Sequence, residues 1–222
     1  MSKVPVITID GLSGAGKGTI SKMLCNDLGW NILDSGALYR TLTYLMEKKE
    51  IDINRFLEKK NDLIKDFKVT FQLGSMGEPV SVFLKETDIT KLVRTEKIAE
   101  KTSALSSLKE IRDFVRPCQR SFKHPPGLIA DGRDMGTVIF PEADTKIFLT
   151  ASLEERAKRR ETQLKRQGSK VNMRFLLSEL EARDKKDIER ELSPLKQAKG
   201  AIVINTTKLS PEEVLGEIKS FL

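Results

Sequence analysis

The chain has few of the residues that build redox, metal or histidine-dependent sites. Its 222 residues include two cysteines and one histidine. Cys25 and Cys118 lie far apart and have no metal-ligand spacing, so we expect two free thiols and no structural metal site. The only histidine, His124, lies in the turn-like segment HPPG, which leaves chemistry that depends on a histidine base with a single weak candidate.

Long hydrophobic runs and aromatic clusters are also missing. No apolar stretch approaches the length that crosses a bilayer, and the N-terminus lacks the apolar segment of a secretory signal. We therefore expect a cytoplasmic protein without a membrane partner. Aromatic residues make up 6% of the chain and do not cluster, which argues against a base-stacking surface for single-stranded nucleic acid. The tetrapeptide Asn-Lys-x-Asp, which is typical of GTPase switches, is absent as well.

Positive charge is what the composition has in excess. Lysine and arginine number 39 against 32 aspartates and glutamates, which gives a net charge of +7. This excess indicates a negatively charged partner, either a nucleic acid or a small phosphate compound, and composition does not separate the two. The length suits one domain with an elaboration rather than two independent domains.

Short apolar runs separated by helical patterns predict an α/β fold with a mainly parallel five-stranded sheet flanked by helices. These runs are VPVITI (4–9), NILD (31–34), GLIAD (127–131), TKIFLTA (145–151) and AIVIN (201–205). Serines that precede a glutamate by three residues predict helix starts at Ser107, Ser152 and Ser210.

One region breaks this alternation. FKVTFQL (67–73) and PVSVFLK (79–85) alternate apolar and polar residues across the connection at 74–78. This pattern predicts an antiparallel hairpin, so we expect a small β insertion over about residues 60–95.

The stretch GLSGAGKGT, residues 11–19, predicts a phosphate-binding loop. It follows an apolar strand and opens a helix, so its glycines can turn backbone N–H groups toward a phosphate, and Lys17 can reach the terminal phosphates of a nucleotide. We expect ATP to bind at Gly11, Leu12, Ser13, Gly14, Ala15, Gly16, Lys17, Gly18 and Thr19.

Gly18 stands where the general phosphate-loop pattern has a serine or threonine. It offers no hydroxyl, so we expect the Mg²⁺ that accompanies ATP to be held mainly by nucleotide phosphates and water. A carboxylate at a neighbouring strand end could assist. Asp34 and Asp131 are the two candidates, and capping the loops that follow them is an equally good role for each.

Three further segments could bind a phosphate acceptor. LDSGALYR (33–40) follows a strand, and Ser35 is expected to cap the next helix. DGRDMGTVIFP (131–141) also follows a strand, at the sheet edge where open α/β proteins bind ligands. In EARDKKDIERELSP (181–194), the spacing of Arg183, Asp187 and Arg190 places all three on one helix face, which suits a charge clamp for phosphate.

Together these segments resemble the bacterial cytidylate kinases, P-loop nucleoside monophosphate kinases that transfer the γ-phosphate of ATP to CMP or dCMP. GKGT is shared by many monophosphate kinases, whereas DSGALYR (34–40) with DGRDMGTVIFP (131–141) is far more distinctive. The resemblance covers nearly the whole chain, including the β insertion, RTEKIAEKTSAL (94–105), KIFLTAS (146–152) and RDKKDIER (183–190).

The resemblance implies a P-loop kinase fold with an acceptor-binding region and a helical lid. We expect a core (about 1–35, 106–152 and 191–222), an acceptor-binding region with the β insertion (about 36–105) and a lid (about 153–190). The implied residues around the acceptor phosphate are Ser35, Arg40, Arg133 and Arg190. Arg183 and Asp187 would hold the sugar, and Ser103, Arg112 and Asp134 would read the base.

The lid segment ASLEERAKRRETQLKRQGSK (151–170) carries several arginines within helical reach of one another. The resemblance implies that this segment closes over ATP and brings arginines to the transferred phosphoryl group. The spacing of the arginines does not identify which of them contacts that group. The expected catalytic residues are Lys17, Arg133, Arg156, Arg159 and Arg190. They would act by positioning and charge neutralisation, with no phosphoenzyme.

The sequence alone leaves two other hypotheses for the function open. The acceptor could be UMP or AMP instead of CMP, or the chain could be a basic P-loop protein that binds nucleic acid. We favour the kinase with ATP and CMP or dCMP as its small-molecule partners and no specific nucleic acid. A monomer is expected, because no coiled-coil heptads or long apolar surface stripe stand out.

Overall fold

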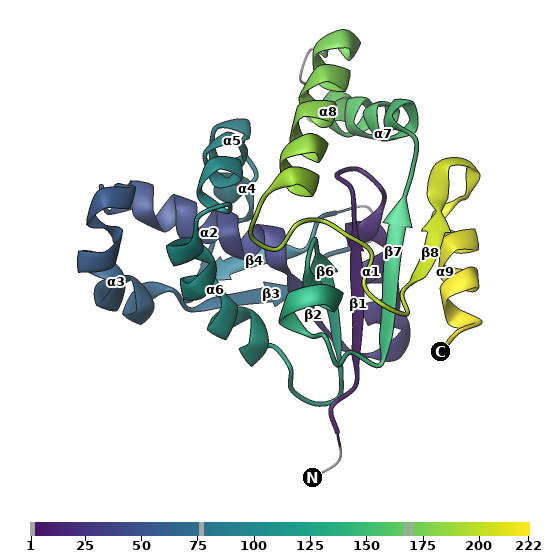
Figure 1. Cartoon of the computed structure of the whole chain (residues 1–222), viewed down its shortest axis with the longest axis horizontal. Helices are drawn as coiled ribbons and strands as arrows, with labels where there is room; N and C mark the ends of the chain where they lie inside the picture. Colours follow the sequence, from purple (N-terminus) through teal and green to yellow (C-terminus); the bar gives the residue numbers. More distant parts are fainter. Residues whose placement is uncertain (1–2, 76–77, 167, 169–170) are drawn as a thin grey trace.

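The computed structural model describes residues 3–75, 78–166, 168 and 171–222. Its centre is a five-stranded parallel sheet with the strand order β2-β6-β1-β7-β8 (Figure 1), which confirms the predicted sheet. The strands are β1 (Val6–Gly11), β2 (Asn31–Asp34), β6 (Leu128–Gly132), β7 (Thr145–Thr150) and β8 (Ile202–Asn205).

Helices cover both faces of this sheet. On one face, α1 (Lys17–Leu28) and α9 (Pro211–Lys219) share a buried apolar cluster with β1, β7 and β8. On the other face, α2 (Ser35–Lys48), α6 (Lys109–Ser121) and the π-helical turn η1 (Met135–Ile139) form a second buried cluster. The strands run upward in Figure 1, so their carboxyl ends open toward two helices at the top of the view.

Those two helices are α7 (Leu153–Arg166) and α8 (Met173–Glu189), which we call the lid helices. They pack on each other through a small cluster of their own, which contains Ala157, Leu176 and Leu180. Because this cluster is separate from the two clusters of the main sheet, mainly polar contacts join the lid helices to the rest of the protein. Residues 167, 169 and 170 of the expected lid segment lie outside the described residues.

The β insertion is a separate antiparallel sheet with the strand order β3-β4-β5. The hairpin of β3 (Val69–Gln72) and β4 (Ser81–Leu84) confirms the prediction, and residues 76–77 of its connection lie outside the described residues. β5 (Thr87–Asp88) was missed because two residues show no alternation. The buried ammonium group of Lys22 in α1 donates to the carbonyls of Ser75 and Glu78, and so fixes the insertion to the phosphate-loop helix.

Along the chain, α3 (Ile53–Asp66) precedes the insertion, and α4 (Thr90–Val93) and α5 (Glu96–Leu105) follow it and pack on α2. The short turn η2 (Thr206–Lys208) follows β8. Two of the predicted helix caps are confirmed: Ser152 accepts from the backbone of Glu155, and Ser210 forms a capping box with Glu213. The prediction that Ser107 caps a helix is wrong, because α6 begins at Lys109 and Leu108 occupies its N-cap position.

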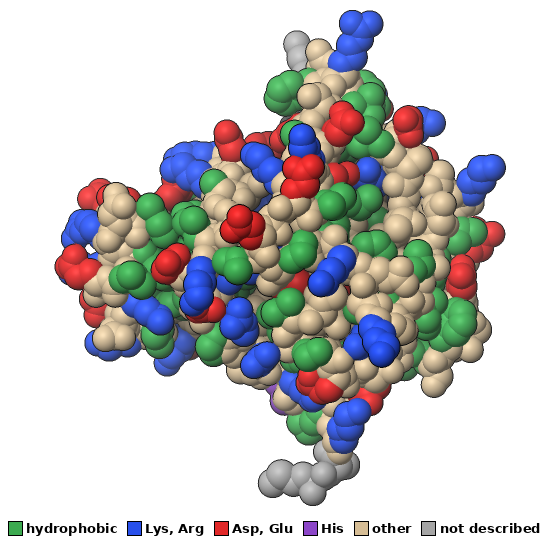
Figure 2. All heavy atoms as spheres, viewed as in Figure 1, with side chains coloured by type: hydrophobic (Ala, Val, Ile, Leu, Met, Phe, Trp, Pro, Cys, Tyr) green, Lys and Arg blue, Asp and Glu red, His purple; other side chains and the backbone are tan. Residues whose placement is uncertain are grey.

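The surface agrees with the composition. On the face seen in Figure 2, lysine and arginine side chains are interspersed with aspartate and glutamate side chains over the visible elements. The excess positive charge is thus spread over this face instead of being collected in one stripe. Within the described ranges, no helix combines the length and apolar character needed to span a bilayer.

Candidate active site

The phosphate loop joins β1 to α1, and its backbone requires glycine. Gly11, Gly14 and Gly16 have φ angles of 149°, 78° and 96°, which other residues rarely adopt. At Gly11 space is lacking as well, since a Cβ would lie 2.1 Å from the carbonyl oxygen of Leu149 in β7. Gly16 occupies the N-cap of α1, so the first N–H groups of the helix are free to bind an anion.

Lys17 begins α1 and is buried at the centre of this loop. Its ammonium group donates to the carbonyl oxygen of Leu12 at 2.8 Å. Burial, with Arg133 nearby, lowers the pKa of Lys17 from 10.5 to about 7, while Asp131 acts in the opposite direction. A bound polyphosphate would replace the missing solvation and favour the charged ammonium form.

Asp34 is the last residue of β2 and Asp131 is the last but one of β6, but the two carboxylates have different surroundings. A Cβ added to Gly18 would lie 3.6 Å from Oδ2 of Asp131, so this carboxylate lies beside the phosphate loop. Burial raises the pKa of Asp131 to about 7. Asp34 instead caps α2, since its Oδ1 accepts from the backbone N–H of Ala37 at 2.9 Å. The expectation that Ser35 caps this helix is therefore wrong by one residue.

Asp10 is a buried residue of the site that sequence reasoning missed. Its two carboxylate oxygens accept hydrogen bonds from the backbone N–H groups of Met135 (2.9 Å) and Gly136 (2.8 Å). Burial raises the pKa of Asp10 to about 6. The aspartate therefore ties β1 to the loop that carries Arg133 and Asp134. A charged residue at the end of an otherwise apolar strand was the signal for it.

Two of the predicted acceptor arginines, Arg133 and Arg190, contact Asp187. Arg133 Nε donates to Asp187 Oδ2 at 2.9 Å, and Arg190 Nη1 lies 3.6 Å from Asp187 Oδ1. Burial alone would raise the pKa of Asp187, but the neighbouring arginines outweigh it and hold that pKa below its ordinary value. Burial lowers the pKa of both Arg40 and Arg183, and each guanidinium feels the repulsion of further arginines.

The predicted base-reading residues include a fully buried ion pair. Arg112 of α6 donates through Nη2 to Asp134 Oδ2, and their side chains are 4% and 3% exposed. The guanidinium also donates to the carbonyl of Ser106 at 2.9 Å and lies 5.7 Å from the centre of the Tyr39 ring. Ser103 is half-buried on α5, one turn before Ser106.

Ser35 is buried at the start of α2 and accepts a hydrogen bond from an unanticipated residue, Gln119 of α6. Arg40 lies one turn further along α2, where its guanidinium donates to the carbonyl of Val93 at 3.2 Å. Both side chains thus lie next to the strand end that carries Asp34.

The lid arginines, which spacing alone treats as equivalent, have separate partners. Arg156 is buried and donates to the Asp184 carboxylate at 2.5 Å and to the carbonyl of Ser13 in the phosphate loop at 3.2 Å. The Arg160 guanidinium pairs with Glu96 of α5. Arg156 therefore connects the lid helices to the phosphate loop, whereas Arg160 connects them to α5.

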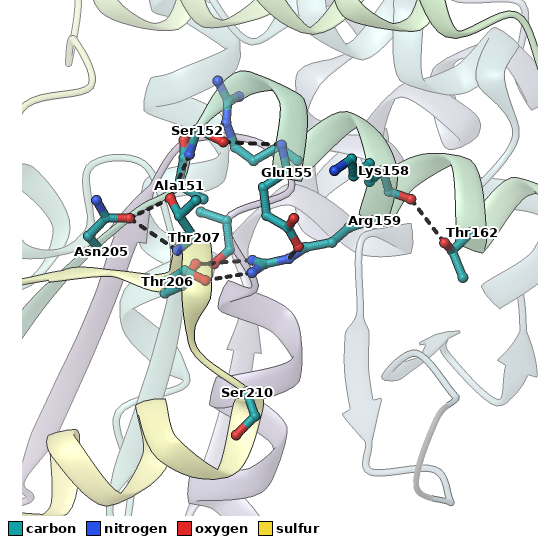
Figure 3. A network of polar contacts seen from close by, with 12 residues as sticks. Ala151, Ser152, Glu155, Lys158, Arg159, Thr162, Asn205, Thr206, Thr207 and Ser210 are labelled. Carbon is teal, nitrogen blue, oxygen red and sulfur yellow. Dashed lines mark hydrogen bonds and ion pairs between the residues drawn. The ribbon is translucent and has the colours of Figure 1, made fainter.

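Arg159 belongs to a polar network at the base of the lid (Figure 3). Its guanidinium donates to the Thr206 carbonyl at 2.6 Å and to the Thr206 hydroxyl at 3.0 Å, and its Nε pairs with Glu155. The same hydroxyl bonds to the carbonyl of Ala15 in the phosphate loop at 3.1 Å. The network therefore holds α7, the turn after β8 and the phosphate loop in one arrangement.

The fold and the site define a P-loop phosphotransferase: a glycine loop with a buried lysine follows the central strand, and Arg133, which follows β6, and Arg183 of α8 lie near that lysine. More narrowly, the chain belongs to the cytidylate kinase family, whose family model matches residues 7–221.

Individual relatives agree over the whole length of the chain. It is 46% identical over 221 residues to the cytidylate kinase of Pseudomonas putida (strain W619), which covers 100% of this chain and 96% of the relative. It is 47% identical over 218 residues to the cytidylate kinase of Pseudomonas fluorescens (strain SBW25), covering 98% and 95%. A crystal structure of an uncharacterized protein from Eubacterium ventriosum is similar in fold, with a TM-score of 0.50 at 14% identity over 99% and 98% of the two chains.

Proposed function

We propose that this protein transfers the γ-phosphate of ATP to CMP or dCMP and releases ADP with CDP or dCDP. Membership of the cytidylate kinase family supports the reaction. The observation that carries it is the arrangement of three groups at one sheet edge: the phosphate loop with Lys17, the cluster around Asp187, and the buried pair of Arg112 with Asp134.

The phosphate donor would bind along the glycine loop. Backbone N–H groups at the start of α1 would face the β- and γ-phosphates, and Lys17 would neutralise their charge. Because phosphoryl transfer needs in-line positioning and charge neutralisation, no covalent intermediate on the protein is required. Arg156 and Arg159 would act mainly by holding the lid helices against the loop, since their guanidinium groups already have protein partners.

Mg²⁺ would accompany ATP, and the surroundings of Gly18 fit such an ion. The nearest carboxylate, Asp131, has the hard oxygen atoms that Mg²⁺ prefers, and Asp34 is engaged as a helix cap. Asp131 would therefore assist the ion directly or through water. The metal would supply charge neutralisation at the phosphates.

The acceptor phosphate would bind among Arg40, Arg133 and Arg190, with Ser35 as a further donor and with Arg183 and Asp187 at the sugar. In the free protein Arg183 is repelled by Arg133 and repels Arg40, and Arg190 is repelled by Arg112, so an added dianion relieves that repulsion. Lid closure would then keep water away from the γ-phosphate and limit ATP hydrolysis.

The base would be read by Asp134, Arg112 and Ser103. Cytosine has an exocyclic amino group that donates to a carboxylate, and its N3 and O2 atoms accept from a guanidinium and a hydroxyl. Uracil has a carbonyl in place of the amino group, so the buried Asp134 carboxylate would face another acceptor, which is unfavourable in a dry site.

The test is a steady-state comparison of CMP, dCMP, UMP and AMP as acceptors with ATP and Mg²⁺. We expect kcat/KM for CMP and dCMP to exceed the value for AMP by a wide margin. Comparable turnover with AMP would contradict the proposal. Size-exclusion chromatography with light scattering on the same preparation tests the monomer that we also propose, and cell fractionation tests the cytoplasmic location.

A further inference from the structure

Gln119 of α6 is buried directly behind Ser35, at the place proposed for the acceptor phosphate. Its side chain is 0% exposed, and its Nε2 donates to the Ser35 hydroxyl oxygen at 2.8 Å. The two residues lie 84 positions apart in the sequence, so only the folded chain brings them together. Ser35 follows β2 at the carboxyl edge of the sheet, where α/β proteins bind ligands.

The direction of this hydrogen bond determines what the Ser35 hydroxyl can do. A hydroxyl group has one proton to donate and two lone pairs. Because the amide N–H of Gln119 occupies a lone pair, the proton of Ser35 is free to point to another acceptor. Within the described part of the chain, the hydroxyl group of Ser35 donates to no protein group. A phosphate oxygen is a strong acceptor for it.

The opposite amide orientation is less favourable. In the structure, the buried Oε1 atom of Gln119 has no hydrogen-bond partner among the described residues. If the amide were flipped, Oε1 would face Ser35 and the Nε2 group would occupy that position instead. Both N–H donors of Nε2 would then be unsatisfied, which costs more than one unsatisfied oxygen. The unsatisfied Oε1 also shows that packing alone does not explain a glutamine here. An apolar side chain of similar size would fill the same space without an unpaired polar atom.

We propose that Gln119 is a positioning residue that holds the Ser35 hydroxyl as a hydrogen-bond donor toward the phosphate of the acceptor nucleotide. It acts through Ser35 and does not touch the substrate. This inference rests on the kinase function proposed above and adds a residue to its acceptor site.

Two substitutions at Gln119 test the direction of the hydrogen bond. In Gln119→Glu, the carboxylate accepts a hydrogen bond from the Ser35 hydroxyl and turns the hydroxyl away from the substrate. We expect the KM for CMP to rise by at least about tenfold, as in Ser35→Ala. In Gln119→Met the hydroxyl is not held in either direction, so the rise is smaller. The KM for ATP stays within about twofold of its original value. Gln197→Met, at an exposed glutamine after α8, is the matched control and leaves both constants unchanged.

The double variant Ser35→Ala/Gln119→Met separates positioning from a general structural role. If Gln119 acts through Ser35, the double variant has the same KM for CMP as Ser35→Ala. Cytidine, which lacks the phosphate, serves as a competitive inhibitor, and its inhibition constant stays unchanged in Gln119→Met. Effects that multiply in the double variant, or an equal weakening of cytidine binding, overturn the inference.

These outcomes are distinct from a failure of the proposed function. If Gln119 has no positioning role, the unchanged protein still consumes ATP in a CMP-dependent manner. If the unchanged protein shows no such consumption, the kinase proposal itself is overturned, whatever the variants do.

Discussion

The carboxylate of Asp187 accepts a hydrogen bond from the guanidinium of Arg133 at 2.9 Å, although Asp187 lies on α8 and Arg133 follows β6. This contact joins the lid helices to the main sheet. The Asp187 carboxylate also supplies the negative charge that keeps Arg133 close to Arg190 and Arg183 before any substrate binds. Removing that charge should therefore affect the acceptor more than the donor.

For Asp187→Asn we expect the KM for CMP to rise by about tenfold or more. The amide keeps the shape of the side chain but leaves the surrounding arginines without their counter-ion. The KM for ATP should change much less. Steady-state kinetics with each substrate varied in turn measures both constants. Asp113→Asn removes an exposed carboxylate that pairs with Lys109, and it should leave both constants unchanged. Equal effects of Asp187→Asn on ATP and CMP would contradict the assignment.

A second prediction concerns discrimination between bases. In Asp134→Asn the amide can present either an oxygen or an N–H group to position 4 of the base, so uracil is no longer rejected. We expect the ratio of kcat/KM for CMP to that for UMP to fall by at least about tenfold. An unchanged ratio would show that Asp134 does not read the base.

The same substitution should lower stability, because Arg112 keeps its charge in a buried place without a counter-ion. Breaking a buried pair in this way costs about 3–5 kcal/mol, and the remaining amide contact brings the expected loss below that range. Thermal unfolding followed by circular dichroism measures the loss, and the kinetics should be recorded well below the melting temperature. Lys109→Met, which removes an exposed partner of Asp113, serves as the stability control and should change little.

The sequence predicted the central sheet well, for a physical reason. Each of its strands is a short apolar run bounded by polar or glycine residues, and burial on both faces of a parallel sheet requires such runs. The two-residue strand β5 has no comparable signal, because its pairing with β4 depends on the hairpin being already in place.

The site was predictable where local sequence determines structure, as in the glycine loop. It was less predictable where partners come from distant segments. Ser35 has a hydroxyl and stands where the helix begins, but the residue that caps α2 is Asp34, one position earlier. The spacing of Arg156, Arg159 and Arg160 places them on one helix, whereas their partners Asp184, Thr206 and Glu96 belong to three other elements. Asp10 and Gln119 were missed because their roles depend on such distant contacts.

A third prediction concerns the pH dependence of ATP binding. Burial lowers the pKa of Lys17 to about 7 in the free protein, and bound phosphates favour the charged form. Above that pH, ATP binding should therefore take up a proton on Lys17, and affinity should decline as pH rises. Isothermal titration calorimetry in buffers of different ionisation enthalpy measures this uptake between about pH 7.5 and 9, where the phosphates of ATP are ionised.

Lys17→Met should reduce the proton uptake and lower kcat with every acceptor, because the variant lacks the titrating lysine and its phosphate contact. Lys22→Met is the matched control, since Lys22 is a second buried lysine of α1 that contacts the insertion instead of the phosphate loop. It should keep the proton uptake. If Lys17→Met took up as many protons on binding ATP as the unchanged protein, another group such as the neighbouring Asp131 would be responsible.

A fourth prediction compares two glycines with opposite surroundings. Gly11→Ala forces an L side chain to φ 149° and places its Cβ 2.1 Å from the carbonyl oxygen of Leu149. Strain and overpacking together should lower the unfolding free energy by about 2–5 kcal/mol, and ATP binding should weaken because the loop moves. Gly216 lies inside α9, and no atom of the described residues lies within 4 Å of its missing Cβ. Gly216→Ala should therefore stabilise the protein by up to about 1 kcal/mol. Denaturant unfolding and ATP titration of both variants test this contrast, and a tolerated Gly11→Ala would refute the proposed need for glycine between β1 and β7.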